Sequence, residues 1–351
     1  MRITCFVTGA TGLLGARVVR RLLEDPDVRA VYALVRAPAV FDSPAVVPVL
    51  GDVGAEGLGI APAVRARLAR EVTTVVHCAA TTSFSQTLDE ARATNTEGTR
   101  RLLDLAAGWH GVTRFVFVST AFVAGARTGV VPERAVAADG WINAYERSKA
   151  EAEVLVRAAR GDWTIARPST VVCDDASGRI SQVNAVHRAL RLYFGGLAAM
   201  LPATADSALD VVTADHAARG IARAALAPYV EGETFHLCAG RGAMPLEELL
   251  DVSYDAFQRS PAWRQKGIAR PVLTDLATYR LFESAIDDAG SVRVRQAVRS
   301  LGHFVPQLAY PKRFETTGAD TLLGATAPAV ASFWGSMVHA LVGAHPAREA
   351  A

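Results

Sequence analysis

Tyr145 and Lys149 stand four residues apart in the stretch NAYERSKAEAE, residues 143–153, and this pair could do chemistry. Residues four apart on a helix share a face, so both side chains can reach one point. A tyrosine that donates a proton to a carbonyl oxygen has a reference pKa of about 10, and a neighbouring cation lowers that pKa by stabilising the phenolate. The pair therefore indicates general acid catalysis at a carbonyl group.

The same stretch has a second interpretation as ordinary helix surface, with ion pairs from Arg147 to Glu151 and from Lys149 to Glu153. Both pairs run from basic to acidic, which is the less favourable order on a helix dipole. The chain has 34 arginines and only 3 lysines, although either cation would serve a surface pair. A compact ammonium beside a phenol is a different requirement, so the scarcity of lysine favours the catalytic interpretation.

Ser119 and Thr120 end the apolar stretch FVFVST, residues 115–120, and either could supply a third member of the site. A hydroxyl at the end of a buried strand lies on the side of a parallel sheet where ligands bind, and it can hydrogen-bond a developing oxyanion. Hydroxyl residues at strand ends are also common turn residues, so in isolation both interpretations stay open.

Three glycines at a spacing of three follow the first apolar stretch, in TGATGLLG at residues 8–15. Gly9, Gly12 and Gly15 would supply the tight turn and the close backbone approach that a dinucleotide pyrophosphate needs at a helix N-terminus. Because the trio stands between a predicted strand and a predicted helix, a dinucleotide site is favoured over a plain turn.

The end of the second predicted strand indicates which dinucleotide binds. An acidic residue there accepts hydrogen bonds from a ribose hydroxyl, as in NAD sites, whereas an arginine accommodates a 2′-phosphate. The stretch YALVRAP, residues 32–38, places Arg36 at this point, which favours NADP(H) over NAD(H); the alternative is a surface arginine. Asp52, in GDV at 51–53, follows the third predicted strand and would lie near the adenine.

Apolar strand-like segments alternate with helical segments from residue 2 to about residue 240. This alternation predicts βαβ units and a doubly wound α/β Rossmann fold, with a parallel sheet and helices on both faces. We predict an NADP-binding domain over 1–240, with an insertion at 178–208 that contributes to the substrate site. A smaller, mostly helical substrate-binding or lid region is predicted over 241–351.

Composition narrows the class of protein. The chain has 37 basic and 35 acidic residues, a net charge of +2, which gives no electrostatic case for nucleic acid. Its four cysteines lie far apart in apolar segments, which favours buried free thiols in a reducing cytoplasm over disulfides or a metal site. No signal peptide precedes the first predicted strand. The late apolar run at 328–345 has helical spacing and contains polar residues, so it predicts an amphipathic helix and no membrane span.

Taken together, the motifs resemble the extended branch of the short-chain dehydrogenase/reductase superfamily over residues 3–240. They are TGATGLLG, HCAA at 77–80, NTEG at 95–98, STAFVAG at 119–125, YERSK at 145–149 and RPS at 167–169. By this likeness Thr120, Tyr145 and Lys149 are catalytic, with Thr120 preferred over Ser119 because it stands five residues before Gly125. The likeness also places Asn95 as the anchor of the helix behind the site. The cofactor contacts that it implies are Gly9, Thr11, Gly12, Leu13, Leu14, Gly15, Arg36, Asp52, Val53, Ala79, Ala80, Asn95, Lys149, Pro168 and Ser169.

Within that branch, VVHCAATTSF, STAFVAG and NAYERSKAEAE look most like the thioester reductase and fatty acyl reductase group. These enzymes use NADPH to reduce acyl groups held on a carrier protein or on coenzyme A, so the resemblance implies an aldehyde or alcohol product and an acyl carrier protein as a partner. The chain departs from the group in lacking the carrier and adenylation domains often joined to such reductases. It also has Ala16 before Arg17, where the group often has the arginine first.

The insertion at 178–208 bears on the substrate. Its apolar residues are Leu190, Leu192, Tyr193, Phe194, Leu197, Met200 and Leu201, beside His187, Arg188 and Arg191. They predict either a core helix with solvated cations or an apolar channel with a cationic mouth for an acyl chain and its phosphate-bearing arm.

The alternative functions are an alcohol dehydrogenase or ketoreductase, or an epimerase, acting on a lipid-like or polyketide-like molecule. A cofactor-binding regulator without turnover would not need the Tyr145–Lys149 pair. The oligomeric state is left open.

Overall fold

A seven-stranded parallel sheet forms the centre of the computed structural model, which describes residues 2–137, 140–228, 233–302 and 304–343. The strand order is β12-β7-β5-β4-β1-β2-β3, and the two halves of the sheet meet between β1 and β4. The strands are β1 (Ile3–Thr8), β2 (Val28–Val35), β3 (Val46–Leu50), β4 (Thr74–His77), β5 (Arg114–Val118), β7 (Trp163–Pro168) and β12 (Glu233–Leu237). This is the doubly wound sheet that the alternating pattern predicted.

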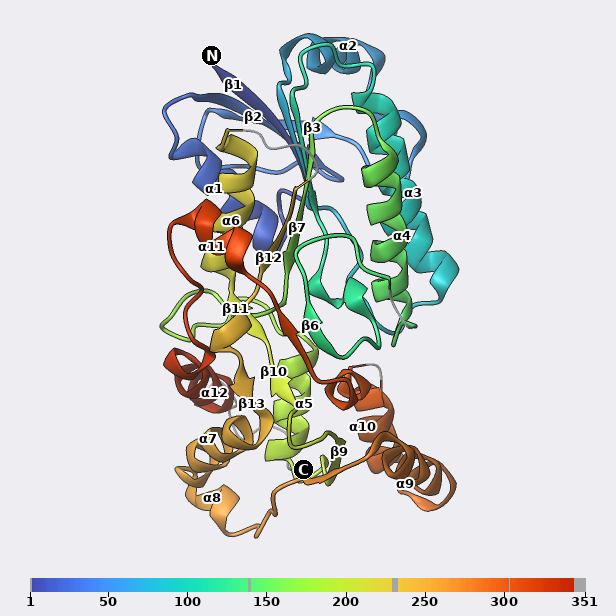
Figure 1. The fold of residues 1–351 in the computed structure, drawn as a ribbon, viewed down its shortest axis with the longest axis vertical. Helices are drawn as coiled ribbons and strands as arrows, with labels where there is room; N and C mark the ends of the chain where they lie inside the picture. The colour runs from blue at the N-terminus through green and yellow to red at the C-terminus, as the bar shows by residue number, and fades with distance from the viewer. Residues whose placement is uncertain (1, 138–139, 229–232, 303, 344–351) are drawn as a thin grey trace.

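Helices cover both faces of the sheet (Figure 1). On one face lie α1 (Leu13–Leu23), α6 (Ala214–Leu226) and α11 (Thr317–Leu323); on the other lie α2 (Pro62–Glu71), α3 (Leu88–Ala106) and α4 (Ala144–Ala158). Short 3-10 turns, η1 (Glu56–Gly59) and η2 (Ala121–Ala124), follow β3 and β5. Each face buries its own apolar core against the strands, so the carboxyl ends of the strands are held in fixed positions.

A smaller lobe lies beyond the carboxyl ends of the strands, in the lower half of Figure 1. Its helices are α5 (Ala185–Phe194), α7 (Leu246–Gln258), α8 (Pro261–Arg264), α9 (Leu276–Ala289), α10 (Val292–Gly302) and α12 (Trp334–Gly343), with the 3-10 turns η3 (Gly240–Gly242), η4 (Val305–Ala309) and η5 (Val330–Ser332). Its short strands are β8 (Thr170–Cys173), β9 (Met200–Pro202), β10 (Ala208–Leu209), β11 (Val211–Thr213), β13 (Met244–Pro245) and β14 (Val272–Thr274).

One apolar core unites this lobe. It joins residues of the 178–208 insertion, such as Leu190, to residues far later in the chain, such as Leu249 and Trp334. Two later segments return to the sheet domain, because α11 packs on α6 and β15 (Lys312–Phe314) pairs in parallel with β6 (Gly129–Val131). The domain boundary at residue 240 stays a prediction.

The late apolar run packs into the lobe core. Val330, Phe333, Trp334, Met337 and Leu341 are all buried there, and the indole nitrogen of Trp334 donates to the Ser253 hydroxyl at 3.0 Å. The last two residues of the run, 344 and 345, lie outside the described residues. No helix within the described ranges is long and apolar enough to cross a membrane. The four cysteines are free thiols.

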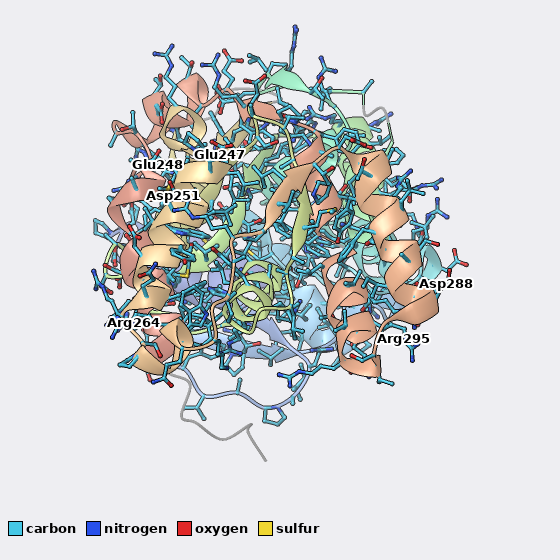
Figure 2. The ribbon with its side chains drawn as sticks, turned by 90° about the horizontal axis from the view of Figure 1, so that it is seen from below. Glu247, Glu248, Asp251, Arg264, Asp288 and Arg295 are labelled. Carbon is cyan, nitrogen blue, oxygen red and sulfur yellow. The ribbon has the colours of Figure 1, made fainter. Side chains whose placement is uncertain are left out.

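Charged side chains lie at the outer edges of the lobe when it is seen from below (Figure 2). Those labelled are Glu247, Glu248 and Asp251 on α7, Arg264 on α8, Asp288 on α9 and Arg295 on α10. The helix α5 lies between the two edges, so the charged surface encloses an apolar interior.

Candidate active site

The glycine turn between β1 and α1 has the geometry of a dinucleotide cradle. Gly9 has a φ of +67°, and a Cβ on it would lie 2.7 Å from the backbone nitrogen of Ala79. A Cβ on Gly15 would collide with the Gly9 carbonyl oxygen. Gly12 is the N-cap of α1 and makes no side-chain cap hydrogen bond, which suits an anionic ligand at the first N–H groups of the helix. The geometry of this turn suits the pyrophosphate of a dinucleotide, and the contacts of the three glycines with it stay a prediction.

The ends of the neighbouring strands are fastened to this turn. The Thr8 hydroxyl accepts from Ala79 N at 3.1 Å and lies 2.6 Å from Nδ1 of His77. Burial lowers the pKa of His77 to about 3, so the ring is neutral and serves as a fixed polar link. Ala79 and Ala80 follow β4 directly beside the glycine turn.

Arg36 lies exposed immediately after β2, at the carboxyl edge of the sheet. Asp52, after β3, is also exposed, but its carboxylate accepts from Gly54 N at 2.8 Å and so closes its own turn. Val53 is buried and stands against Gly98 of α3. Arg36 is thus exposed at the carboxyl edge of the sheet, and its contact with a 2′-phosphate stays a prediction, while Asp52 has one oxygen committed to the turn.

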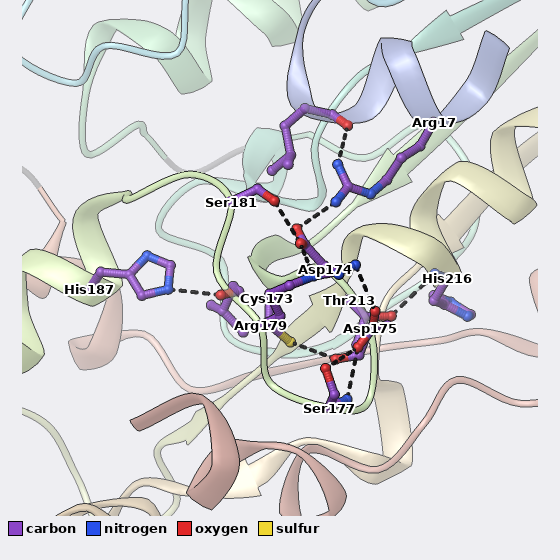
Figure 3. A network of polar contacts seen from close by, with 12 residues as sticks. Arg17, Cys173, Asp174, Asp175, Ser177, Arg179, Ser181, His187, Thr213 and His216 are labelled. Carbon is purple, nitrogen blue, oxygen red and sulfur yellow. Dashed lines mark hydrogen bonds and ion pairs between the residues drawn. The ribbon is translucent and has the colours of Figure 1, made fainter. Parts of the chain in front are cut away.

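Arg17 is occupied by protein groups (Figure 3). Its guanidinium donates to the Leu13 carbonyl at 3.0 Å and pairs with the buried carboxylate of Asp174 at 2.5 Å. Arg179 and Ser181 bond the second oxygen of the same carboxylate, at 2.9 and 2.6 Å. Arg17, which stands one residue later than the arginine often found in the thioester reductase group, therefore joins α1 to the loop after β8.

Thr120 and Tyr145 are brought together. Tyr145 lies in the first turn of α4, which Asn143 caps by accepting from Glu146 N at 3.0 Å. Thr120 follows β5 and hydrogen-bonds the Tyr145 hydroxyl, whereas the adjacent Ser119 hydroxyl is buried and has no hydrogen-bond partner among the described residues. Successive side chains at a strand end point to opposite sides, which explains why only one of the two hydroxyls meets Tyr145.

Lys149 departs from the expected arrangement. Its buried ammonium donates to the Val118 carbonyl at 2.7 Å and lies 4.0 Å from the centre of the Phe117 ring. Burial lowers the pKa of Lys149 to about 7, against the opposing charge of Glu153. Among the described residues no hydrogen bond joins it to Tyr145.

The expected lowering of the Tyr145 pKa by a lysine is therefore not seen. Burial raises the pKa of Tyr145 to about 12, and the hydrogen bond with Thr120 opposes that rise. A phenol with this pKa stays protonated at neutral pH, which is the form that a proton donor to a carbonyl oxygen requires.

Asn95 joins α4 to the loop after β4. Its amide nitrogen donates to the Ser148 hydroxyl at 2.9 Å and to the Thr81 carbonyl at 3.1 Å, and its oxygen accepts from Thr81 N at 2.9 Å. On the other side of the site, Pro168 ends β7, and the buried Ser169 hydroxyl has no hydrogen-bond partner among the described residues. These contacts hold the frame around Tyr145 and Lys149 in place.

An apolar pocket with a cavity volume of about 60 Å³ lies inside the lobe. Its walls are Val186, Ala189, Leu190, Tyr193, Ala198, Leu201, Leu209, Leu246, Leu249, Leu250, Pro271, Leu301, Phe304, Val305, Leu308 and Trp334. Carbon atoms make up nearly all of this surface. Of the cations expected at a channel mouth, His187 is instead buried, with Nε2 2.8 Å from the Val172 carbonyl and Nδ1 accepting from Asn184 N. That correction leaves Arg188, which is exposed, and Arg191, which is half-buried.

Two aromatic rings connect this pocket to Tyr145. The Tyr145 and Phe84 ring centres are 5.6 Å apart, and Phe84 stacks on Phe304 with centres 6.3 Å apart. Because Phe304 lines the pocket, the apolar space begins two rings away from the phenol.

Sequence reasoning missed these rings and three linked polar residues, namely Glu146, which follows Tyr145, Gln307, which bonds Glu146, and Lys312, which bonds Gln307. Phe84 lay within a quoted motif but had no assigned role. The scarcity of lysine, which singled out Lys149, applied equally to Lys312 and could have found it.

Comparison with known proteins places the chain among NAD-binding proteins. A family model described as male sterility protein, an NAD-binding family, matches residues 7–43 and 38–221. A putative fatty acyl-CoA reductase of Drosophila melanogaster is 38% identical over 144 residues, which cover 34% of this chain and 28% of that protein. The match thus spans under a third of the relative's length.

Two solved structures share the fold. The terminal R domain from the myxalamid PKS-NRPS biosynthetic pathway has a TM-score of 0.77 at 24% identity, covering 97% of this chain and 91% of that one. A thiolation-reductase di-domain from an archaeal non-ribosomal peptide synthetase has a TM-score of 0.71 at 18% identity, covering 98% and 76%. The superposition extends through the lobe as well as the sheet domain.

Proposed function

The chain belongs to the NAD-binding male sterility protein family, and we propose that it reduces acyl thioesters with NADPH. It is an NAD(P)-dependent oxidoreductase of the extended short-chain dehydrogenase/reductase type. The observation that carries the proposal is the apolar pocket two rings away from Tyr145. The walls of this pocket suit an aliphatic acyl group, whereas a sugar would need polar partners that the walls lack.

In the proposed reaction the residues of the site act on the acyl carbonyl oxygen. The nicotinamide, when bound, supplies a hydride to the carbonyl carbon. The Thr120 hydroxyl holds the oxygen, and the protonated Tyr145 hydroxyl donates to it. The thiol that leaves would belong to coenzyme A or to the phosphopantetheine arm of a carrier protein, consistent with the relatives' names. The product would be an aldehyde, or the alcohol after a second round.

We expect reactivity to follow acyl chain length. Each methylene buried in the pocket contributes about 0.8 kcal/mol, so kcat/KM on a series of saturated acyl-coenzyme A substrates should rise roughly fourfold per methylene until the pocket is full. Leu190→Trp, in the pocket wall, should shift the optimum to shorter chains. The control Leu281→Trp, at a leucine that is 72% exposed on α9, should leave the series unchanged. Equal rates for short and long chains would contradict the assignment of the pocket.

NADPH is the proposed cofactor because Arg36 stands exposed at the end of β2. Arg36→Ala should weaken NADPH binding by about 1–3 kcal/mol, the scale of a charge-assisted hydrogen bond, and leave NADH binding unchanged. Nicotinamide fluorescence titration measures both. Arg29→Ala, at an exposed position on the same strand, is the control. Equal wild-type affinities for NADPH and NADH would refute the preference.

The second candidate is a ketoreductase or alcohol dehydrogenase acting on a lipid-like or polyketide-like molecule. The same pocket and the same Tyr145 would serve it. The two candidates differ in one chemical respect, because a ketone has no leaving group.

A further inference from the structure

A buried polar chain joins the lobe to the start of α4 and lies outside the cofactor contacts. The Glu146 carboxylate, next to Tyr145, accepts from Gln307 Nε2 at 2.5 Å and from Asn143 Nδ2 at 2.9 Å. Its second oxygen accepts from Ile142 N at 3.0 Å. Gln307 belongs to η4 and stands 161 residues away in the sequence. The lobe therefore bonds directly to the residue after the proposed proton donor.

The chain continues to the segment that carries Thr120. The Lys312 ammonium on β15 donates to the Gln307 side-chain oxygen at 2.9 Å and to the Gly125 carbonyl at 2.7 Å. Gly125 ends η2, and Thr120 caps its beginning. One row of three side chains thus contacts both segments that bring Thr120 and Tyr145 together.

The charges within this row are sensitive to pH near neutrality. Burial raises the pKa of Glu146 to about 7, and burial lowers the pKa of Lys312 to about 8. The positive charge of Lys312 lowers the pKa of Glu146, and the negative charge of Glu146 raises the pKa of Lys312, so each charge opposes the effect of burial on the other group. The other titratable groups around the row are Tyr145 beside Glu146, Tyr310 with its ring centre 5.7 Å from the Lys312 ammonium, and Asp210 in the same polar pocket.

We propose that Glu146, Gln307 and Lys312 are positioning residues that hold Tyr145 and Thr120 in register for catalysis, so that the lobe sets the geometry of the proton donor. This rests on the proposed role of Tyr145 in carbonyl reduction. The geometry carries it, because the row bonds to the carbonyl that ends the Thr120 segment and to the N-terminal turn that holds Tyr145. With Glu146 ionised and Lys312 charged, all three links are strong; protonation of Glu146 removes the acceptor for at least one donor.

The test compares Glu146→Gln and Lys312→Met with Lys266→Met, which changes a lysine exposed on the lobe. In the wild type kcat should fall as the pH drops through about 7, where Glu146 takes up a proton. Glu146→Gln should lose this acid limb and lower kcat about tenfold, with KM for the acyl thioester and NADPH affinity unchanged. Lys312→Met should lower kcat to a similar extent and move the acid limb to higher pH, because the Lys312 charge lowers the pKa of Glu146. The double variant should lose little more kcat than either single variant. Lys266→Met should match the wild type.

A second readout does not depend on turnover. In protein labelled with ¹³C-tyrosine, the Tyr145 resonance, assigned by its loss in Tyr145→Phe, should move as the pH passes about 7 in the wild type and stay still in Glu146→Gln. Melting curves and NADPH titrations establish that each variant is folded. An acid limb that persists unchanged in Glu146→Gln, or a Tyr145 resonance that still moves with pH in that variant, would overturn the proposal. Absence of thioester turnover in the wild type, with the resonance moving as described, would instead count against the proposed function alone.

Discussion

Tyr145→Phe should lower kcat on any substrate of this protein by about 10²-fold or more, the usual scale for loss of general acid catalysis. The variant keeps the ring that packs on Phe84, with centres 5.6 Å apart, and removes only the hydroxyl that Thr120 contacts. The fold, the pocket and the NADPH affinity should therefore stay as they are. Steady-state NADPH oxidation and a nicotinamide fluorescence titration measure the two quantities separately.

A matched control is available in the lobe. Tyr254 packs on Trp263 with ring centres 5.1 Å apart, and Tyr254→Phe removes a hydroxyl of the same kind far along the chain from the site. It should leave kcat unchanged. If Tyr145→Phe turned over like the wild type while Tyr254→Phe did too, Tyr145 would not be the proton donor.

The sheet domain could be predicted from the sequence because its signals are local. Strands and helices alternate with clear periodicity, and the turn containing Gly9 has a positive φ that other residues rarely adopt. A hydroxyl at this edge of the sheet was expected because the stretch FVFVST ends there, and the choice of Thr120 over Ser119 rested on the likeness to the extended branch.

The lobe side of the site could not be predicted, because its contacts join residues far apart in sequence. Gln307 meets Glu146 across 161 residues, and no local pattern specifies that pairing. The hydrogen-bond partner of Lys149 could not be predicted for a related reason. Helical spacing places a side chain on a face, but its terminal ammonium goes to whichever acceptor is nearest, here the Val118 carbonyl.

Reduction of a thioester differs from reduction of a ketone in what leaves the substrate. Addition of a hydride and a proton to the thioester carbonyl gives a hemithioacetal, whose collapse breaks the carbon–sulfur bond and releases a thiol and an aldehyde. A ketone keeps every atom of its skeleton after the same addition. Thiol release is therefore a property of the proposed reaction that the second candidate cannot share. The amount of thiol released should be stoichiometric with the NADPH oxidised.

The most direct test of the account measures free thiol and NADPH oxidation together, with a long-chain acyl-coenzyme A as substrate and Tyr145→Phe as the control for background hydrolysis. We expect thiol to appear in step with NADPH loss, at one thiol per NADPH if the aldehyde is the product and one per two if reduction continues to the alcohol. In Tyr145→Phe both signals should fall together. Oxidation of NADPH by ketones or aldehydes, without thiol release from any acyl thioester tried, would contradict thioester reduction and favour the ketoreductase.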